Sequence, residues 1–169
     1  AALGSAPALV LLQTRAHNPT GASLTAERAA ELARLLQRSR TAPHTVVIED
    51  DHSGAISSSP DVTLASTLPD RVLHVKSFSK SHGPDLRIAA IGGAAAPLRQ
   101  LERRRSLGPS WTSRLTQQIL LAMLLDPAVE DGVKHAGATY VQRRRWFVDA
   151  LDTHGLSLHV GAGLNIAVP

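Results

Sequence analysis

Hydrophobic residues occur along this chain in short continuous runs, each ended by glycine, proline, serine or charged residues. Runs of about four to eight apolar residues bounded by turn residues are typical of strands that are buried on both faces of a sheet. The predicted strands are Ala8–Thr14, Thr45–Glu49, Val72–Val75 and Leu86–Ile91. Gly92 and Gly93 close the last of them.

Other stretches carry apolar residues at the spacing of an amphipathic helix. The first begins after Thr25, which is a suitable N-cap, with Glu27 in the first turn, and it runs to about Arg38. The remaining predicted helices are Pro97–Ser106, Trp111–Leu125 and Val129–Thr153. Ser53–Ser59 is predicted to be a loop from its glycine and serine content. Short strands are predicted at the end of the chain, at Leu156–Val160 and Leu164–Val168.

The order strand, helix, strand, loop, strand and strand predicts an α/β fold with a largely parallel sheet and helices on its faces. Near Ala94–Pro97 the sequence changes from strand-rich to helix-rich. We therefore expect residues 1–125 to form a larger portion that contains the sheet, and residues 126–169 to form a long helix and the start of a small C-terminal domain. The chain begins just before one predicted strand and stops inside another, so we expect a fragment.

Composition narrows the classes of function. The chain has 169 residues, of which 43% are hydrophobic and 19% charged, as in an ordinary globular domain. Aromatic residues make up only 3%, which gives little support to nucleic-acid binding by base stacking. The absence of cysteine excludes disulfides and thiolate chemistry. The apolar run Ala8–Leu12 is too short to span a bilayer, so we expect no membrane partner and a cytoplasmic location.

Polar clusters follow the buried strands. Asn18 stands in a Pro-Thr-Gly turn after the first strand, Asp50–His52 follows the second, and Ser77–Lys80 follows the third, with Arg87 further on. The carboxyl ends of parallel strands lie along one edge of a sheet, and ligands bind in the crevice outside that edge. These side chains are therefore expected to converge. Together they offer what an aldehyde cofactor with a phosphate group and a pyridine ring requires.

Each cluster also has a plainer interpretation when it is taken alone. Asn18–Gly21 is a common turn sequence, and Lys80 and Arg87 would ordinarily be solvated charges. The group Asp50–His52 could be solvated acids at a strand end or part of a site for a hard metal ion. No further ligand cluster is spaced to complete such a site, so we predict no metal.

Taken in order, the clusters resemble a known signature. The series is Asn18-Pro19-Thr20-Gly21, then Asp50-Asp51-His52, then Ser77-Phe78-Ser79-Lys80, then Arg87. It looks like the signature of fold-type I pyridoxal-phosphate enzymes, the class I/II aminotransferases. Within them it is most similar to the aminotransferase-like domain of MocR-type regulators in the GntR superfamily. The resemblance implies part of a fold-type I large domain, a mostly parallel sheet with flanking helices, leading into a small α+β domain.

The resemblance also implies roles for individual residues. Lys80 would form the aldimine with pyridoxal 5'-phosphate and later carry a proton to or from the substrate. Asp50 would pair with the pyridine nitrogen, because a carboxylate there keeps the ring protonated. Asn18 would donate its amide to the phenolic oxygen of the ring. Arg87 and the hydroxyl of Ser77 would hold the phosphate.

The chain departs from the family pattern at one of these positions. The family usually has a tyrosine two residues after the pyridine-binding aspartate, and here that residue is His52. Imidazole can donate one hydrogen bond from a shorter side chain, so His52 is included as a cofactor contact. The glycine-containing helix N-terminus that the family uses for the phosphate does not precede Ala1, and we expect the chain by itself to be inactive or nearly so.

The leading interpretation is an aminotransferase that moves an amino group between an amino acid and a 2-oxo acid. The alternative is a ligand-sensing domain of a MocR-type transcription regulator, in which DNA would be a partner only if a winged helix is fused upstream. A third interpretation is an α/β protein that binds phosphate or metal without an aldimine. The family resemblance also implies a homodimer, with Ser106–Gln118 as a candidate contact.

Overall fold

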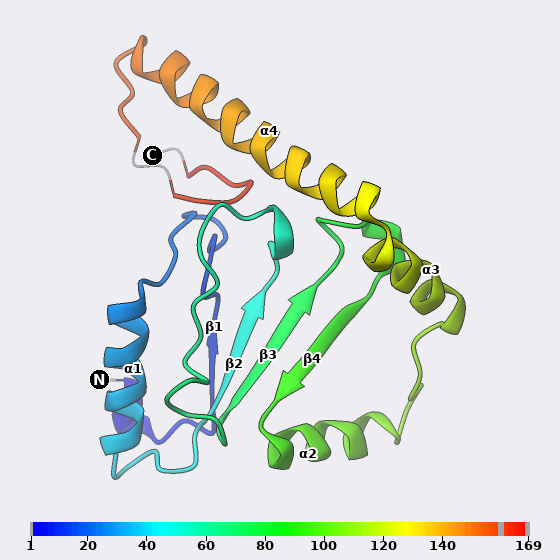
Figure 1. The fold of residues 1–169 in the computed structure, drawn as a ribbon. Coiled ribbons are helices and arrows are strands. Elements are labelled where there is room, and N and C mark those ends of the chain that lie inside the picture. The colour runs from blue at the N-terminus through cyan, green and yellow to red at the C-terminus, as the bar shows by residue number, and fades with distance from the viewer. Residues whose placement is uncertain (1, 159–160, 168–169) are drawn as a thin grey trace.

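The computed structural model describes residues 2–158 and 161–167. At its centre is a four-stranded sheet whose strands lie side by side in chain order (Figure 1). They are β1 (Leu9–Leu12), β2 (Val46–Asp51), β3 (Val72–Ser77) and β4 (Ala89–Gly93). β1, β2 and β3 are parallel, and β4 is antiparallel to β3. The predicted α/β fold with a mostly parallel sheet is confirmed.

Four α-helices and three short 3-10 turns complete the described structure. The helices are α1 (Ala26–Arg38), α2 (Ala95–Arg105), α3 (Arg114–Leu125) and α4 (Pro127–Asp152), and the turns are η1 (Ala2–Ser5), η2 (Gly54–Ile56) and η3 (Pro84–Leu86). Thr25 caps α1 as predicted, because its hydroxyl accepts a hydrogen bond of 3.1 Å from the backbone N–H of Arg28. In the described part of the chain, we find no helix with the length and apolar character that crossing a bilayer requires.

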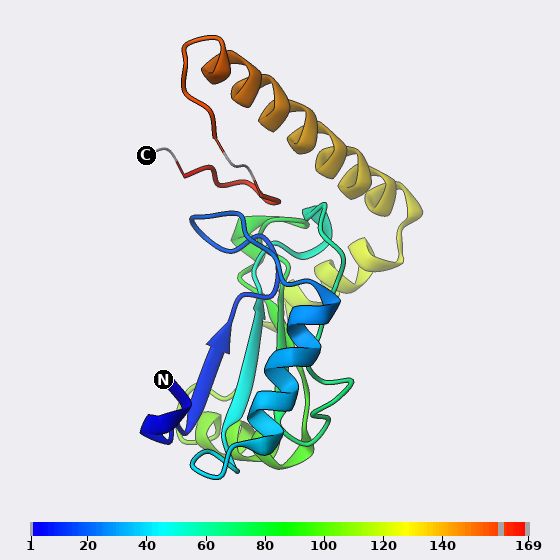
Figure 2. The same ribbon diagram turned by 90° about the vertical axis from the view of Figure 1, so that its left-hand side faces the viewer.

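The core lies between α1 and one face of the sheet (Figure 2). Its buried members are Ala29, Ala33, Leu36, Val47, Leu64, Leu68 and Val72. Leu64 and Leu68 come from the connection between β2 and β3, which has no helix or strand over residues 57–71. Along β2 burial alternates, so Val47, Glu49 and Asp51 are buried while Asp50 is only half-buried and belongs to the opposite face.

The carboxyl ends of β1, β2 and β3 point toward α4, which crosses above them (Figure 1). The backbones of α4 and η2 approach closely at Gly137, where a Cβ atom would lie 3.5 Å from the carbonyl oxygen of Ile56. Arg144 of α4 donates hydrogen bonds to the hydroxyl of Ser58 and the carbonyl of Gly163. The long helix and residues 161–163 are therefore anchored to the loops at this edge of the sheet.

Several predicted boundaries were wrong. β4 begins at Ala89 rather than Leu86, because η3 and the left-handed backbone of Arg87 (φ 51°) interrupt the extended chain. α3 begins at Arg114, with Ser113 as its N-cap, so Trp111 lies in the irregular segment before it. β2 and β3 each run two residues further than predicted, because Asp50 and Asp51 still pair with Val75 and Lys76.

The strands predicted at the end of the chain are not formed in the described residues. Residues 156–158 and 161–167 contain no strand, whereas residues 159, 160, 168 and 169 of these predictions lie outside the described part. The backbone N–H of Ala162 instead donates to the carbonyl of Gly21, at 2.8 Å. This segment thus lies against the turn after β1 and does not add to the sheet.

Candidate functional site

Loops from all four strands meet at one edge of the sheet. The residues after β1, β2 and β3 lie at the carboxyl ends of those strands, and the start of β4 lies at the same edge because β4 is antiparallel. Ser77 pairs with Ala89, and the N–H of Phe78 donates to the carbonyl of Ile88 at 3.2 Å. Arg87, which directly precedes Ile88, is therefore held next to the loop that carries Lys80.

Asn18 and Asp50 are connected through Gln13. The Nε2 amide of Gln13 donates to Oδ2 of Asp50 at 3.1 Å, and its Oε1 accepts from the backbone N–H of Asn18 at 2.9 Å. The other carboxylate oxygen of Asp50 has no hydrogen-bond partner among the described residues. Asp50 is half-buried and Asn18 is exposed, so both are accessible to a ligand at the sheet edge.

The pKa of His52 is shifted by burial and by the charges around it. Burial lowers the pKa of His52, and the nearby charge of Lys80 lowers it further, against the attraction of Asp50 and Asp51. Nε2 of His52 lies 3.3 Å from the hydroxyl of Ser53. Its Nδ1 is buried and has no hydrogen-bond partner, which is uncommon for a buried polar atom. His52 thus has a lowered pKa and one buried ring nitrogen without a partner.

The loops after β2 and β3 contact each other through Gly54. This residue has a left-handed backbone (φ 57°), and a Cβ atom there would lie 3.0 Å from the carbonyl oxygen of Ser77. The hydroxyl of Ser77 accepts a hydrogen bond from the N–H of Ser79 at 3.3 Å, which shapes the turn before Lys80. Lys80 and Arg87 are exposed, and neither cation has a hydrogen-bond or ion-pair partner in the described residues.

A buried ion pair lies directly beside these loops. Arg15 donates two hydrogen bonds to Asp51, from Nε to Oδ1 at 3.0 Å and from a terminal nitrogen to Oδ2 at 2.6 Å. The N–H of Gly54 also donates to Oδ1 of Asp51, at 3.0 Å. Burial raises the pKa of Asp51, but the hydrogen bonds from Arg15 and its charge outweigh this, so the pKa lies below its ordinary value.

The polar cluster continues inward to Glu49 and His74. Glu49 is fully buried and accepts from the backbone N–H of Leu64 at 2.6 Å and from the hydroxyl of Thr63 at 2.7 Å. Nδ1 of His74 lies 3.4 Å from Oε2 of Glu49. Its hydrogen bond with Glu49 raises the pKa of His74, against the effect of burial, and the charges of Asp61 and Asp51 raise it further.

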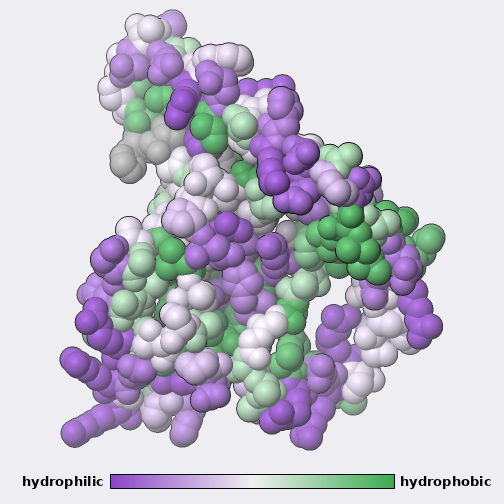
Figure 3. All heavy atoms as spheres, in the orientation of Figure 1, coloured by the Kyte–Doolittle hydropathy of each residue, from purple (hydrophilic) through white to green (hydrophobic). Residues whose placement is uncertain are grey.

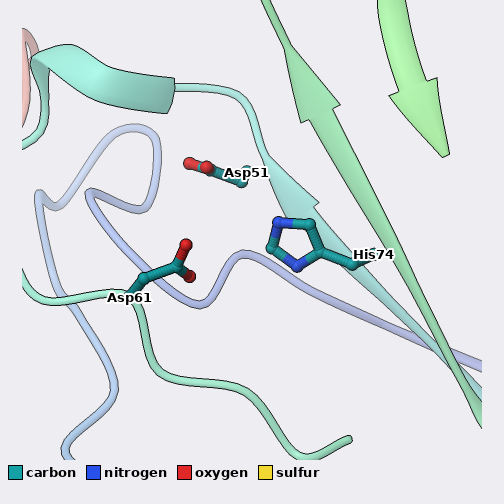
Figure 4. A group of neighbouring side chains, drawn as sticks. All are labelled: Asp51, Asp61 and His74. Carbon is teal, nitrogen blue, oxygen red and sulfur yellow. The ribbon is translucent and has the colours of Figure 1, made fainter. Parts of the chain in front are cut away.

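Asp51, Asp61 and His74 lie close enough to suggest a metal site. One ligand atom from each falls within 4.8 Å of the others, and Figure 4 shows the imidazole of His74 opposite the two carboxylates. However, both oxygens of Asp51 already accept hydrogen bonds, and Arg15 supplies the positive charge that a metal ion would bring. The three residues that the sequence suggested for a metal, Asp50, Asp51 and His52, do not form such a group, because Asp51 belongs to the opposite face from Asp50.

This region also contains four residues that were not predicted from the sequence, namely Gln13, Arg15, Glu49 and His74. Glu49 and Asp51 could have been recognised from the two-residue period of β2, since both share a face with Val47. Arg15 and Gln13 gave no such signal, because their partners are 36 and 37 residues away along the chain.

The residues present fit pyridoxal phosphate. The edge offers a free amine at Lys80, a carboxylate with an open oxygen at Asp50, an unpaired buried nitrogen at His52 and an unpaired guanidinium at Arg87. An aldehyde, a pyridine nitrogen, a phenolic oxygen and a phosphate need groups of these kinds.

Comparison with known proteins gives the class. The family described as "Aminotransferase class I and II" matches residues 1–163, and the chain belongs to this family. Members of this family, including those with solved structures, are generally pyridoxal-phosphate-dependent.

Particular relatives include both regulators and enzymes. The chain is 36% identical to the vitamin B6 salvage pathway transcriptional repressor PtsJ of Salmonella typhimurium, over 99% of this chain and 38% of the repressor. It is 25% identical to the aminotransferase swnA of Metarhizium robertsii, over 97% of this chain and 37% of that protein. Among solved structures, aspartate aminotransferase from Rhizobium meliloti is 28% identical with a TM-score of 0.81, covering 92% of this chain and 39% of that one. The chain thus spans about two fifths of the length of these relatives.

Proposed function

We propose that this chain binds pyridoxal phosphate and holds it covalently through Lys80. The observation that carries the proposal is the group of unpaired functional atoms at one sheet edge: the Lys80 amine, the open oxygen of Asp50 and the buried Nδ1 of His52. Membership of the aminotransferase class I and II family supports the same cofactor.

The proposed roles follow from the chemistry of each side chain. Asp50 would accept a hydrogen bond from the protonated pyridine nitrogen, and Asn18 and His52 would donate to the phenolic oxygen. Ser77 and Arg87 would hold the phosphate, and Arg87 suits this because its guanidinium is planar and always charged. When bound, the cofactor supplies an electron sink for negative charge at the substrate α-carbon. Lys80 would then carry a proton at its Nζ atom to and from that carbon.

We further propose that this domain senses a ligand within a transcription regulator. The similarity to the repressor PtsJ extends over 99% of this chain, and further relatives are described as HTH-type transcriptional regulators. In that case DNA is a partner of the whole protein, and its location is cytoplasmic. Transfer of an amino group between an amino acid and a 2-oxo acid is the second candidate, favoured by the similarity to the Metarhizium aminotransferase.

We also propose that the whole protein is a homodimer and that residues 1–125 and 126–169 belong to different domains. Leu107, Trp111 and Leu115 are 87%, 76% and 71% exposed. All three lie within the Ser106–Gln118 segment, and Figure 3 shows apolar surface over α3. Exposed apolar side chains in this number are typical of a surface that another chain or domain covers. The division at residue 126 coincides with Asp126, which ends α3 and caps α4.

Covalent attachment can be tested directly. The chain contains three lysines, Lys76, Lys80 and Lys134, so a modified peptide identifies its lysine without ambiguity. The chain is incubated with pyridoxal phosphate, reduced with borohydride, digested and analysed by mass spectrometry. We expect the added mass on Lys80, its loss in Lys80→Ala and its retention in Lys134→Ala. Modification spread over all three lysines would contradict the proposal.

Experiments on the whole protein can distinguish a regulator from an aminotransferase. A regulator changes its affinity for promoter DNA when pyridoxal phosphate or an amino acid is added, and it converts little amino acid in the presence of a 2-oxo acid. An aminotransferase shows many turnovers of that conversion and no DNA binding.

A further inference from the structure

We propose that Gln13 is a positioning residue of the cofactor site, which sets the Asp50 carboxylate and the Asn18 turn with one side-chain amide. The proposal rests on the proposed function, because Asp50 and Asn18 are taken as cofactor contacts.

The two hydrogen bonds of Gln13 fix the orientation of its amide. Nε2 lies 3.1 Å from Oδ2 of Asp50, and Oε1 lies 2.9 Å from the backbone nitrogen of Asn18. A carboxylate can only accept and a backbone N–H can only donate, so only this orientation satisfies both partners. The planar amide therefore joins the end of β2 to the turn after β1.

The position of Gln13 in the sheet explains why a side chain is needed here. β1 ends at Leu12, which pairs with Glu49, and Gln13 is the next residue in register with Asp50. The backbone ladder between β1 and β2 stops at that pair. Beyond it, the side chain of Gln13 makes the connection that backbone hydrogen bonds make within the sheet.

Gln13 and Arg15 bind the neighbouring carboxylates of Asp50 and Asp51 in different ways. Arg15 neutralises the buried Asp51 with a full positive charge. Gln13 holds Asp50 with a neutral amide, so the negative charge of Asp50 is kept while one of its oxygens is anchored. The other oxygen stays open. Only Asp50 is thus both fixed and still able to pair with a protonated ring nitrogen, which is the arrangement that a preorganised binding group requires.

The test compares the dissociation constant of pyridoxal phosphate, measured by absorbance titration, in the unchanged chain and in three variants. Gln13→Ala removes both hydrogen bonds, and we expect about tenfold weaker binding, as for the loss of one hydrogen bond to a charged group. Gln13→Glu keeps the acceptor for Asn18 but places a second carboxylate beside Asp50, and we expect a loss of at least about tenfold. Gln100→Ala, at an exposed glutamine with no side-chain hydrogen bond, is the matched control and should bind as the unchanged chain does.

A double-mutant cycle with Asp50→Asn distinguishes positioning from a general effect on the fold. An asparagine at position 50 can donate to a glutamate at position 13, so the like-charge conflict disappears. We expect Gln13→Glu to weaken binding by at least about tenfold beside Asp50 but by less than about threefold in the Asp50→Asn background. A merely structural role for Gln13 would give the same loss in both backgrounds.

The outcomes separate this proposal from the one on which it rests. If the unchanged chain carries pyridoxal phosphate on Lys80 and Gln13→Ala and Gln13→Glu bind it equally well, Gln13 is not a positioning residue although the proposed function stands. Equal losses from Gln13→Glu in the two Asp50 backgrounds also overturn it. If the unchanged chain shows no modification of Lys80, the proposed function fails, and this inference fails with it.

Discussion

Arg15 and Asp51 form a buried bidentate ion pair that connects the loops of the candidate site. The two hydrogen bonds measure 3.0 and 2.6 Å, and Arg15 also donates to the backbone carbonyl of Gly54 at 3.0 Å. One guanidinium thus fixes the chain just after β1 against the end of β2 and against η2. Asp50 and His52, the proposed cofactor contacts on either side of Asp51, are held by the same interaction.

Removing one member of this pair should be strongly destabilising. Arg15→Ala leaves Asp51 as an unpaired buried charge, and we expect the free energy of unfolding to fall by about 3–5 kcal/mol. Urea unfolding followed by circular dichroism measures the change. The double variant Arg15→Met with Asp51→Leu removes both charges, and it should be more stable than Arg15→Ala alone.

The exposed pair Arg28 and Glu31 provides the matched control. Its two atoms are also 2.6 Å apart, but both side chains are about half exposed. Arg28→Ala should therefore change the free energy of unfolding by less than about 1 kcal/mol. Equal effects of Arg15→Ala and Arg28→Ala would contradict the account of the buried pair.

His74 should make stability depend on pH above about 6.5. Its hydrogen bond with Glu49 raises its pKa in the folded state above the ordinary 6.5. The stabilisation is therefore fully present below about 6.5 and is lost as the pH rises through the folded pKa. The difference in unfolding free energy between the unchanged chain and His74→Gln should shrink from pH 6 to pH 9.

At acidic pH, Glu49 and Asp51 should make stability fall as the pH decreases. Both have a pKa below the ordinary values of 4.5 and 3.8, so their stabilisation is lost as the pH falls below those values. A constant difference between the unchanged chain and His74→Gln over pH 6 to 9 would count against the Glu49 interaction.

Leu64 should be one of the most sensitive core positions. It is 1% exposed and packs in the cluster formed by α1 and the sheet, although it lies in a segment without helix or strand. Leu64→Ala should lower the unfolding free energy by about 2–5 kcal/mol, because it leaves a cavity. Leu35→Ala removes the same atoms at a position that is 49% exposed and should lower it by less than about 1 kcal/mol. Similar losses at both positions would place Leu64 outside the core.

The sheet and the order of its loops could be predicted because apolar runs and turn residues are local signals. β1, β2, β3 and α1 were found in this way, and the cap at Thr25 was correct. The start of β4 and the conformation of residues 161–167 could not be predicted in this way. They depend on η3 and on the contact of Ala162 with Gly21, which involve residues that are neighbours in space. The core contribution of Leu64 was missed for the same reason.

In the candidate site too, only the residues with a local sequence signal could be predicted. Asn18, Asp50, Ser77, Lys80 and Arg87 stand out in the sequence because each follows or precedes a recognisable strand. Gln13 and Arg15 do not, since their partners lie across the sheet. In the sequence, only the family resemblance singled out Asp50 rather than Asp51. The alternation of β2 separates them, placing one at the open face and the other against Arg15.

The central claim is that Lys80 holds pyridoxal phosphate, and peptide mass mapping after borohydride reduction tests it most directly. We expect one phosphopyridoxyl group for each chain, found on the peptide that contains Lys80, and its absence from Lys80→Ala. Modification of Lys76 or Lys134 to the same extent, or no modification of any lysine, would contradict it.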